Sequence, residues 1–242
     1  MMPNQPGIAS FFPAGSPVPA PKAPPLDVPP YMTSLPTRLR GVNLAPGWRA
    51  HGPLLVWEYE SPAPCASIAA FDFDGCLANT PLHGDANDWK MQFANVPCVL
   101  QGLHERGVKI VIITNESMDR FKSADAIGKC IRKKCGRLEG FCRAVGVPIQ
   151  VLCATGGTSK NPDPFRKPGT AAFSWMAESA NGGIAPDLER CFYVGDAAGR
   201  PGDHSDSDAI FARNIGLEFF TETRFFEAVS YTHLTLPTNK AV

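Results

Sequence analysis

The sequence of 242 residues lacks the features that mark several protein classes. Its eight cysteines form no Cys-x-x-Cys pair and it has only five histidines, so the spacing favours neither a structural zinc site nor a disulfide framework. No apolar run approaches the roughly 20 residues that a membrane span needs. The N-terminus has no basic start followed by an apolar segment. We therefore expect a soluble intracellular protein with no membrane partner.

The sequence also has no excess of charge of either sign, because 23 basic side chains balance 23 acidic ones. The overall charge argues neither for nor against nucleic acid as a partner, and any basic footprint must be local. No Gly-x-x-x-x-Gly-Lys-Ser/Thr loop is present, since GGTSK at 156–160 has the wrong spacing. A kinase-type phosphate loop is therefore not expected in this chain.

The composition divides the chain into three parts. Residues 1–36 are crowded with Pro, Ala, Gly and Ser, cannot bury enough apolar surface to offset their ordering entropy, and are predicted to be disordered. Residues 37–229 carry the patterns of a folded domain. Residues 230–242 (SYTHLTLPTNKAV) fit neither a helix nor a core strand, and we expect a non-native or disordered tail.

Within the middle part, short apolar strands alternate with helices. Short strands are expected in GVNLAPGW and LLVWEYE, and then at 67–73, 108–114, 148–154, 191–196 and 217–220. Helices are expected at 98–105, 120–145 with a break near Gly136, 170–180 and 207–215. This order predicts an α/β fold, a doubly wound parallel sheet of the Rossmann type preceded by short β segments. Ligands of such sheets bind outside the carboxyl ends of the strands.

Polar side chains stand at or just beyond the ends of four of these strands. They are Asp72 and Asp74, then Thr114 and Asn115, then Lys167 in FRKP, and Asp196 in YVGD. A single Asp at a strand end is often only a turn or cap residue. An ordered set at four strand ends has no such simple explanation, because a parallel sheet places all of them on one rim.

The residue types at this rim suit phosphoryl transfer. Asp72 can attack phosphorus while Asp74, two residues on, handles a proton. A phosphate dianion repels a carboxylate, so a cation must screen the approach, and Mg²⁺ prefers oxygen ligands. Asp72, the backbone carbonyl of Asp74 and Asp196 are the expected metal ligands. Thr114 can donate to a phosphate oxygen, and Lys167 can neutralise the remaining charge.

The segments FDFDGCLANT, ITNES, FRKPGT and YVGDAAGR resemble the four motifs of the haloacid dehalogenase-like phosphohydrolases. More narrowly, FRKP, YVGDAAGR and DHSDSD resemble the polynucleotide 3′-phosphatases, which include the phosphatase half of polynucleotide kinase/phosphatase and its stand-alone plant and fungal relatives. The similarity covers about Gly47 to Ala228. It implies a haloacid dehalogenase-like fold, an aspartyl-phosphate on Asp72, acid–base catalysis by Asp74 and Mg²⁺ as cofactor. It also implies DNA with 3′-phosphate ends as substrate, and DNA repair in the nucleus.

Two positions depart from the pattern of many members. Cys76 stands where many members have Thr, and Glu116 stands where vertebrate members have Gln. Plant-type sequences share both residues, so neither places the activity in doubt. By its position alone Cys76 is interpreted as a packing residue, with Asp72 as the nucleophile.

The sequence also leaves no room for a large cap domain over the site. The intervals from Asp74 to Thr114 and from Thr114 to Lys167 are short, and both must hold core helices. An open site admits a polymer end. It also fits a phosphatase that acts on proteins.

Several residues are candidates for contacts with DNA. A basic cluster follows the second motif: Arg120, Lys122, Lys129, Arg132, Lys133, Lys134 and Arg137. Such side chains bind phosphates without sequence preference, although a solvated helix face is an equal alternative. Arg166 and Arg200 neighbour motif residues and are the stronger phosphate-binding candidates. Trp89 can stack on a base or simply pack.

Three residues of GDHSDSD have expected supporting roles. Asp203 and His204 are predicted to shape the outer shell of the metal. Asp208 is predicted to cap the helix that follows.

The N-terminal segment contains a second pattern, formed by Gln5, Ile8, Phe11 and Phe12. Its spacing resembles a PCNA-interacting peptide, in which one tight helical turn presents apolar plugs to the sliding clamp. The alternative is an incidental hydrophobic patch.

Three functions remain open from the sequence. The favoured one is a DNA 3′-phosphatase that cleans break ends. The others are a capless phosphatase for phosphoproteins or small esters, and an inactive clamp- or DNA-binding module. The intact acids argue against the inactive module, and the FRKP and AAGR strings argue against the small-ester enzyme.

Overall fold

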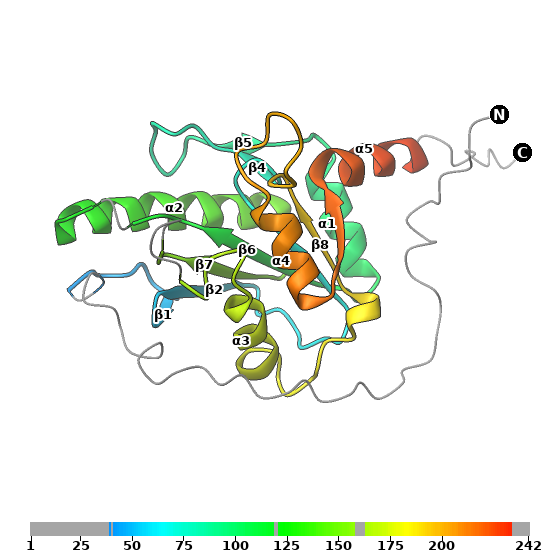
Figure 1. The fold of residues 1–242 in the computed structure, drawn as a ribbon, viewed down its shortest axis with the longest axis horizontal. Coiled ribbons are helices and arrows are strands. Elements are labelled where there is room, and N and C mark those ends of the chain that lie inside the picture. Colours follow the sequence, from blue (N-terminus) through cyan, green and yellow to red (C-terminus); the bar gives the residue numbers. More distant parts are fainter. Residues whose placement is uncertain (1–38, 40, 119–120, 158–162, 234–242) are drawn as a thin grey trace, which may run out of the picture.

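A computed structural model describes residues 39, 41–118, 121–157 and 163–233, with side chains up to Glu227. Figure 1 shows a central sheet with helices on both faces. Seven strands form this sheet in the order β1-β2-β7-β6-β3-β8-β9. Their bounds are Arg49–His51 (β1), Leu54–Tyr59 (β2), Ile68–Phe71 (β3), Lys109–Asn115 (β6), Ile149–Ala154 (β7), Phe192–Gly195 (β8) and Glu218–Thr221 (β9). A separate two-stranded ladder pairs Ala78–Asn79 (β4) with Lys90–Met91 (β5).

The five strands β7, β6, β3, β8 and β9 run parallel, and β1 and β2 extend the sheet antiparallel beside β7. The strand order reverses at β3. The chain adds β6 and β7 on one side of β3 and then β8 and β9 on the other side, as in a doubly wound sheet. The α/β fold class expected from the sequence is therefore confirmed, with β1 and β2 as short β segments on its N-terminal side.

The helices are Val96–Glu105 (α1), Ala124–Val145 (α2), Ala171–Ser179 (α3), Ser207–Ile215 (α4) and Glu222–His233 (α5), with a 3₁₀ turn at Leu188–Arg190 (η4). Strand residues alternate between the two faces of the sheet. Phe71 and Ile112 join a core with apolar residues of α1, α2 and α5. Ala70 and Val111 join a second core with apolar residues of α3 and α4. Both faces of the central strands are thus buried.

Helix α2 differs from its predicted form at two points. It begins at Ala124 rather than near residue 120, because Ser123 is its N-cap and accepts from the backbone N–H of Ala126 at 3.2 Å. The predicted break near Gly136 is wrong, since the helix is continuous to Val145. Gly136 instead serves close packing: a Cβ there would lie 2.6 Å from Cβ of Ala86.

Other elements also depart from expectation. GVNLAPGW forms no strand up to Gly47, and the first strand begins only at Arg49. The β4–β5 ladder and α5 were not predicted. Helix α5 continues to His233, past the domain end expected at residue 229. The predicted N-terminal tail of residues 1–36 lies outside the described residues.

Nothing resembling a large cap covers the sheet edge within the described residues. Between Asp74 and Thr114 the chain forms only the β4–β5 ladder and α1 before it enters β6. The expected lack of a large cap is thus confirmed for this interval. Among the described helices, none is both long and apolar enough to cross a membrane.

Candidate active site

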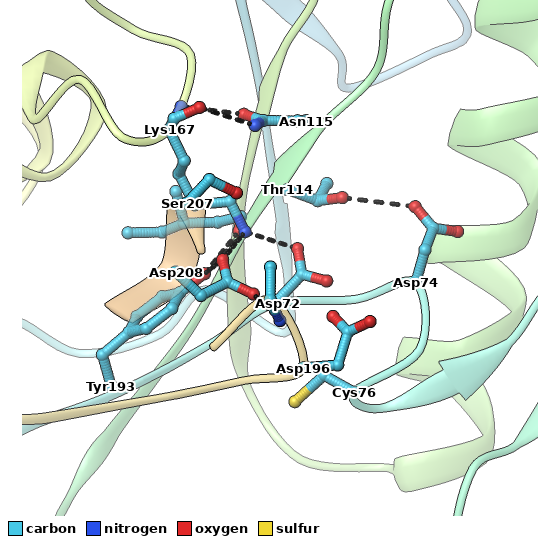
Figure 2. Close-up of polar contacts among 12 residues, drawn as sticks. Asp72, Asp74, Cys76, Thr114, Asn115, Lys167, Tyr193, Asp196, Ser207 and Asp208 are labelled. Carbon is cyan, nitrogen blue, oxygen red and sulfur yellow. Dashed lines mark hydrogen bonds and ion pairs between the residues drawn. The ribbon is translucent and has the colours of Figure 1, made fainter. Parts of the chain in front are cut away.

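The polar residues predicted at four strand ends meet at one edge of the sheet. Asp72 follows β3 directly, and its backbone N–H donates to the carbonyl of Val194 in β8 at 2.9 Å. Thr114 and Asn115 are the last residues of β6. Asp196 follows β8. Figure 2 shows these side chains gathered around a common space. The strand-end argument from the sequence therefore placed them correctly.

Lys167 forms a buried ion pair with Asp72. Its amine lies 2.5 Å from Asp72 Oδ1 and 2.8 Å from Asp208 Oδ1, and donates to the Tyr193 hydroxyl at 2.6 Å. The side chain of Asn115 fixes the Lys167 backbone, because it accepts from the Lys167 N–H at 3.0 Å and donates to the Lys167 carbonyl at 3.1 Å. All of these amine contacts are buried, so the Lys167 amine is fixed beside Asp72.

Asp74 faces a different set of partners. The Thr80 hydroxyl donates to Asp74 Oδ1 at 2.6 Å, and the Lys134 amine forms an ion pair with Asp74 Oδ2. Lys134 also donates to Thr114 Oγ1 at 2.9 Å. Figure 2 shows the Asp74 carboxylate turned toward Thr114 and away from Asp72. The two carboxylates are thus held separately, as two different chemical roles require.

The pKa values of these carboxyl groups are driven apart. Burial raises the pKa of Asp72 to about 7, although Lys167 opposes the rise, and burial raises that of Asp196 to about 6. Burial acts in the same direction on Asp74, but the charge and hydrogen bonds of Lys134 and Thr80 outweigh it and lower the pKa of Asp74. Acidic groups with opposite shifts in one site are typical of acid–base and nucleophilic catalysis.

The same side chains can hold a divalent cation. Carboxylate oxygens of Asp72, Asp196 and Asp208 lie within 4.8 Å of one another. Both Asp208 oxygens are already occupied, one by Lys167 and the other by the backbone N–H of Ala197 at 3.0 Å. Asp196 Oδ1, by contrast, is buried and accepts no hydrogen bond from the described residues. An orphaned carboxylate oxygen beside a second carboxylate fits a hard cation such as Mg²⁺.

Gly75 allows this approach of the acids. Its φ is 87°, and a Cβ at this position would lie 2.5 Å from Asp196 Oδ2. A side chain here would push Asp196 away from Asp72. The glycine after the two acids is therefore a requirement of the site.

A family model described as "Polynucleotide kinase 3 phosphatase" matches residues 67–226, more than half of the chain, and includes all of the rim residues. The chain belongs to this family. The resemblance to the polynucleotide 3′-phosphatases, inferred from the motifs, is thereby confirmed.

Three curated relatives show the same similarity. Polynucleotide 3′-phosphatase ZDP of Arabidopsis thaliana is 42% identical over 197 residues, which cover 78% of this chain and 28% of that protein. An uncharacterised 20.8 kDa protein of Autographa californica nuclear polyhedrosis virus is 33% identical over 74% of this chain and 97% of its own length. The bifunctional polynucleotide phosphatase/kinase of Schizosaccharomyces pombe is 32% identical over 76% of this chain and 43% of that protein. The chain thus spans less than half the length of the Arabidopsis and yeast relatives.

The fold was also compared with a solved structure that is more distant in sequence. D,D-heptose 1.7-bisphosphate phosphatase from B. bronchiseptica, complexed with magnesium and phosphate, is 13% identical with a TM-score of 0.44. The alignment covers 69% of this chain and 99% of that chain.

Two residues of this polynucleotide kinase 3 phosphatase family member were assigned wrongly from the sequence. Lys134 and Arg137 were placed in an exposed DNA-binding cluster, but both are buried. Lys134 belongs to the active site through Asp74 and Thr114, and Arg137 donates to the carbonyls of Pro81 and Asp85. A signal was present, because Lys134 lies three and four residues from Ile131 and Leu138 on the apolar stripe of α2.

Asp208 was also misplaced. It was expected to cap α4, but the N-cap is Asp206, and Asp208 lies buried within the first turn. Its carboxylate bonds to Lys167, Tyr193 and the Ala197 N–H. Gly195 makes room for it, since a Cβ there would meet Asp208 Oδ2 at 2.4 Å. The sequence signal was again an acid on the apolar side of a helix.

The remaining predicted residues lie around this centre. Arg200 is bound to Asp203 and Glu222, and also donates to the Asp196 carbonyl at 2.8 Å, so it supports the loop that carries Asp196. Asp203 accepts from two backbone N–H groups of the same loop. His204 is exposed, with Nδ1 3.9 Å from Asp196 Oδ2.

Four further residues have separate outcomes. Trp89 is half-buried and packs edge-on against Phe141 at 6.0 Å, in agreement with the packing alternative. Arg166 has a buried Nη1 that donates to none of the described residues. Arg120 lies outside the described residues. Cys76 is buried and donates to the Val194 carbonyl, as expected of a packing residue.

Proposed function

We propose that this protein removes 3′-phosphates from DNA strand-break ends through an aspartyl-phosphate on Asp72. The observation that carries the proposal is the separate placement of two carboxylates: Asp72 lies against Lys167, and Asp74 is held apart by Lys134 and Thr80. Membership of the polynucleotide kinase 3 phosphatase family supports the choice of substrate.

In the first step, a carboxylate oxygen of Asp72 bonds to phosphorus while the bond from phosphorus to the 3′ oxygen of the sugar breaks. Asp74 gives its proton to that leaving oxygen, which departs as the 3′ hydroxyl. Thr114 and Lys167 donate to the phosphate oxygens, on which negative charge must be stabilised.

In the second step, water attacks the phosphorus of the aspartyl-phosphate. Asp74, now a carboxylate, takes a proton from this water, and the bond from phosphorus to Asp72 breaks. Phosphate leaves and both aspartates return to their starting states. Without substrate the lowered pKa of Asp74 favours the carboxylate, which is the form that this step uses, whereas the first step uses the protonated form.

Asp72, Asp196 and the backbone carbonyl of Asp74 would hold Mg²⁺. When bound, the ion offsets the repulsion between Asp72 and the phosphate. Asn115 and Arg200 then act as positioning residues, because their contacts run to the Lys167 backbone and to the Asp196 carbonyl. Arg166 is a candidate for direct phosphate contact through its buried Nη1.

The assay is release of phosphate from a nicked duplex that carries a 3′-phosphate. We expect turnover with Mg²⁺, none with EDTA, and none for Asp72→Asn with the fold intact. Activity confined to small phosphate esters would contradict the DNA 3′-phosphatase. Phosphoprotein substrates and an inactive binding module are excluded if the nicked duplex is the preferred substrate.

We further propose that the segment with Gln5, Ile8, Phe11 and Phe12, outside the described residues, binds the PCNA sliding clamp, and that the protein acts in the nucleus. The pattern of an aliphatic and two aromatic anchors supports this. A pull-down with Phe11→Ala/Phe12→Ala tests the clamp, and undiminished binding would refute it. Microscopy of a fluorescent fusion tests the location.

A further inference from the structure

Tyr193 in β8 places a hydroxyl group inside the core, and the proposed catalytic steps do not use it. The side chain is fully buried, and its ring packs against Phe211 of α4 with the ring centroids 4.8 Å apart. A phenylalanine would fill the same space, and burial of a hydroxyl costs free energy unless the group is hydrogen-bonded. The partners of this hydroxyl therefore indicate why a tyrosine stands here.

The Tyr193 hydroxyl connects Lys167 to strand β6. It accepts from the Lys167 amine at 2.6 Å and lies 3.2 Å from both the Ile113 carbonyl and Asp208 Oδ1, either of which can accept its proton. Ile113 directly precedes Thr114, which donates to the phosphate in the proposed mechanism. The hydroxyl thus joins two chain segments that both supply a phosphate donor.

Three acceptors among the described residues occupy the three N–H bonds of the Lys167 ammonium group. They are Asp72 Oδ1 at 2.5 Å, Asp208 Oδ1 at 2.8 Å and the Tyr193 hydroxyl at 2.6 Å. Figure 2 shows these three side chains converging on the amine. Lys167 must therefore release one of them before it can donate to a phosphate oxygen.

Asp72 is the partner that Lys167 can release. Asp208 and Tyr193 are buried below the rim, and loss of the lysine would leave their oxygens with an unmet hydrogen bond, which costs free energy. The Asp72 carboxylate, in contrast, loses its negative charge when one of its oxygens bonds to phosphorus. Its attraction for the amine then falls, at the moment when the phosphate oxygens need a donor.

We propose that Tyr193 is a positioning residue for phosphoryl transfer. Together with Asp208 it holds the Lys167 amine in place while one N–H of that amine moves from Asp72 to a phosphate oxygen. The inference rests on the proposed function and adds how the lysine keeps its position through both steps.

The variant that tests this is Tyr193→Phe, which keeps the ring and removes only the hydroxyl. Tyr59→Phe is the matched control, because Tyr59 ends β2 opposite Ile149, at the edge of the sheet away from the active site. For Tyr193→Phe we expect kcat on a 3′-phosphorylated oligonucleotide to fall about 10- to 100-fold, the effect of one hydrogen bond to a charged group. KM should stay nearly unchanged, because the interaction acts during transfer. The control should retain the kcat of the unaltered protein.

Inhibition by orthovanadate and by inorganic phosphate, with Mg²⁺ present, gives a second readout. Orthovanadate can adopt the five-coordinate geometry of the transferring phosphoryl group, and analogues of a transition state report interactions made only there. Tyr193→Phe should weaken inhibition by orthovanadate about as much as it lowers kcat, and inhibition by phosphate far less. Equal weakening of both inhibitors, or an unaltered kcat, would overturn the assignment of Tyr193.

Thermal unfolding establishes that Tyr193→Phe is folded at the assay temperature. If it is not, Asp208→Asn takes the same two measurements, because it weakens the other buried anchor of Lys167, and the same outcomes decide. Both assays are repeated with p-nitrophenyl phosphate. If the unaltered protein hydrolyses this ester but releases no phosphate from the oligonucleotide, the proposed DNA substrate fails, whereas the role of Tyr193 is then judged from its effect on the ester.

Discussion

Lys134 links the two groups that handle the leaving oxygen and the phosphate, because its buried amine contacts both Asp74 and Thr114. We predict that Lys134→Met lowers kcat on a 3′-phosphorylated oligonucleotide about 100-fold, the smallest usual contribution of a general acid or base. Steady-state kinetics measure this. Lys134→Arg should recover part of the loss because it keeps the charge. A change in thermal stability with kcat unaltered would show that Lys134 is only structural.

At the scale of single residues, the sequence predicted those parts of the site that strand ends dictate. Asp72, Thr114 and Asp196 follow from the geometry of a parallel sheet. Lys134 and Asp208 did not, because they reach the site from helices, where no rule of strand ends applies. Their contacts depend on how the helices pack across the sheet, which the pattern of apolar residues alone does not fix.

Helix α2 packs so closely against the segment between β4 and β5 that a glycine in the helix, Gly136, is needed at the contact. In most helices Gly→Ala stabilises by about 1 kcal/mol. We predict that result for Gly128→Ala, where the nearest atom is the flexible end of Arg132 at 3.1 Å. Gly136→Ala should instead destabilise by about 1–3 kcal/mol, because the new Cβ would meet Ala86 at 2.6 Å. Urea unfolding of both variants measures the difference, and equal stabilisation of the two would refute this packing.

Helices and strands with a long, regular pattern of apolar residues were predicted correctly, and those with short or weak patterns were missed. The β-branched run of β6 and the apolar run of β7 identified central strands correctly. The two-residue strands β4 and β5 were missed because a pairing so short leaves no periodic pattern. The break predicted in α2 was wrong because Gly136 serves contact with another segment, and sequence alone does not show such contacts.

At the scale of the whole molecule, the buried carboxyl groups of Asp72 and Asp196 make the stability of the folded state depend on pH and on a bound metal ion. The pKa values of Asp72 and Asp196 are about 7 and about 6 in the folded protein, above the ordinary value of 3.8. The folded state therefore binds protons more tightly, and stability is lost as pH rises from about 4 to about 7. We predict that Tm falls over this range in EDTA, and that Mg²⁺ reduces the fall because it binds the ionised carboxylates. An equal Tm with Mg²⁺ and with EDTA above pH 7 would contradict a cation site here.

The central claim is that Asp72 bonds covalently to the phosphate. The direct measurement is an acid quench of the protein with a DNA end that carries a ³²P-labelled 3′-phosphate. We predict label on the protein that hydroxylamine removes, as expected of an acyl phosphate. The label should be absent in Asp72→Asn. In Asp74→Asn, which lacks both the acid for the first step and the base for the second, label should form more slowly and, once formed, persist longer. Turnover without protein-bound label, or label that survives in Asp72→Asn, would contradict the account.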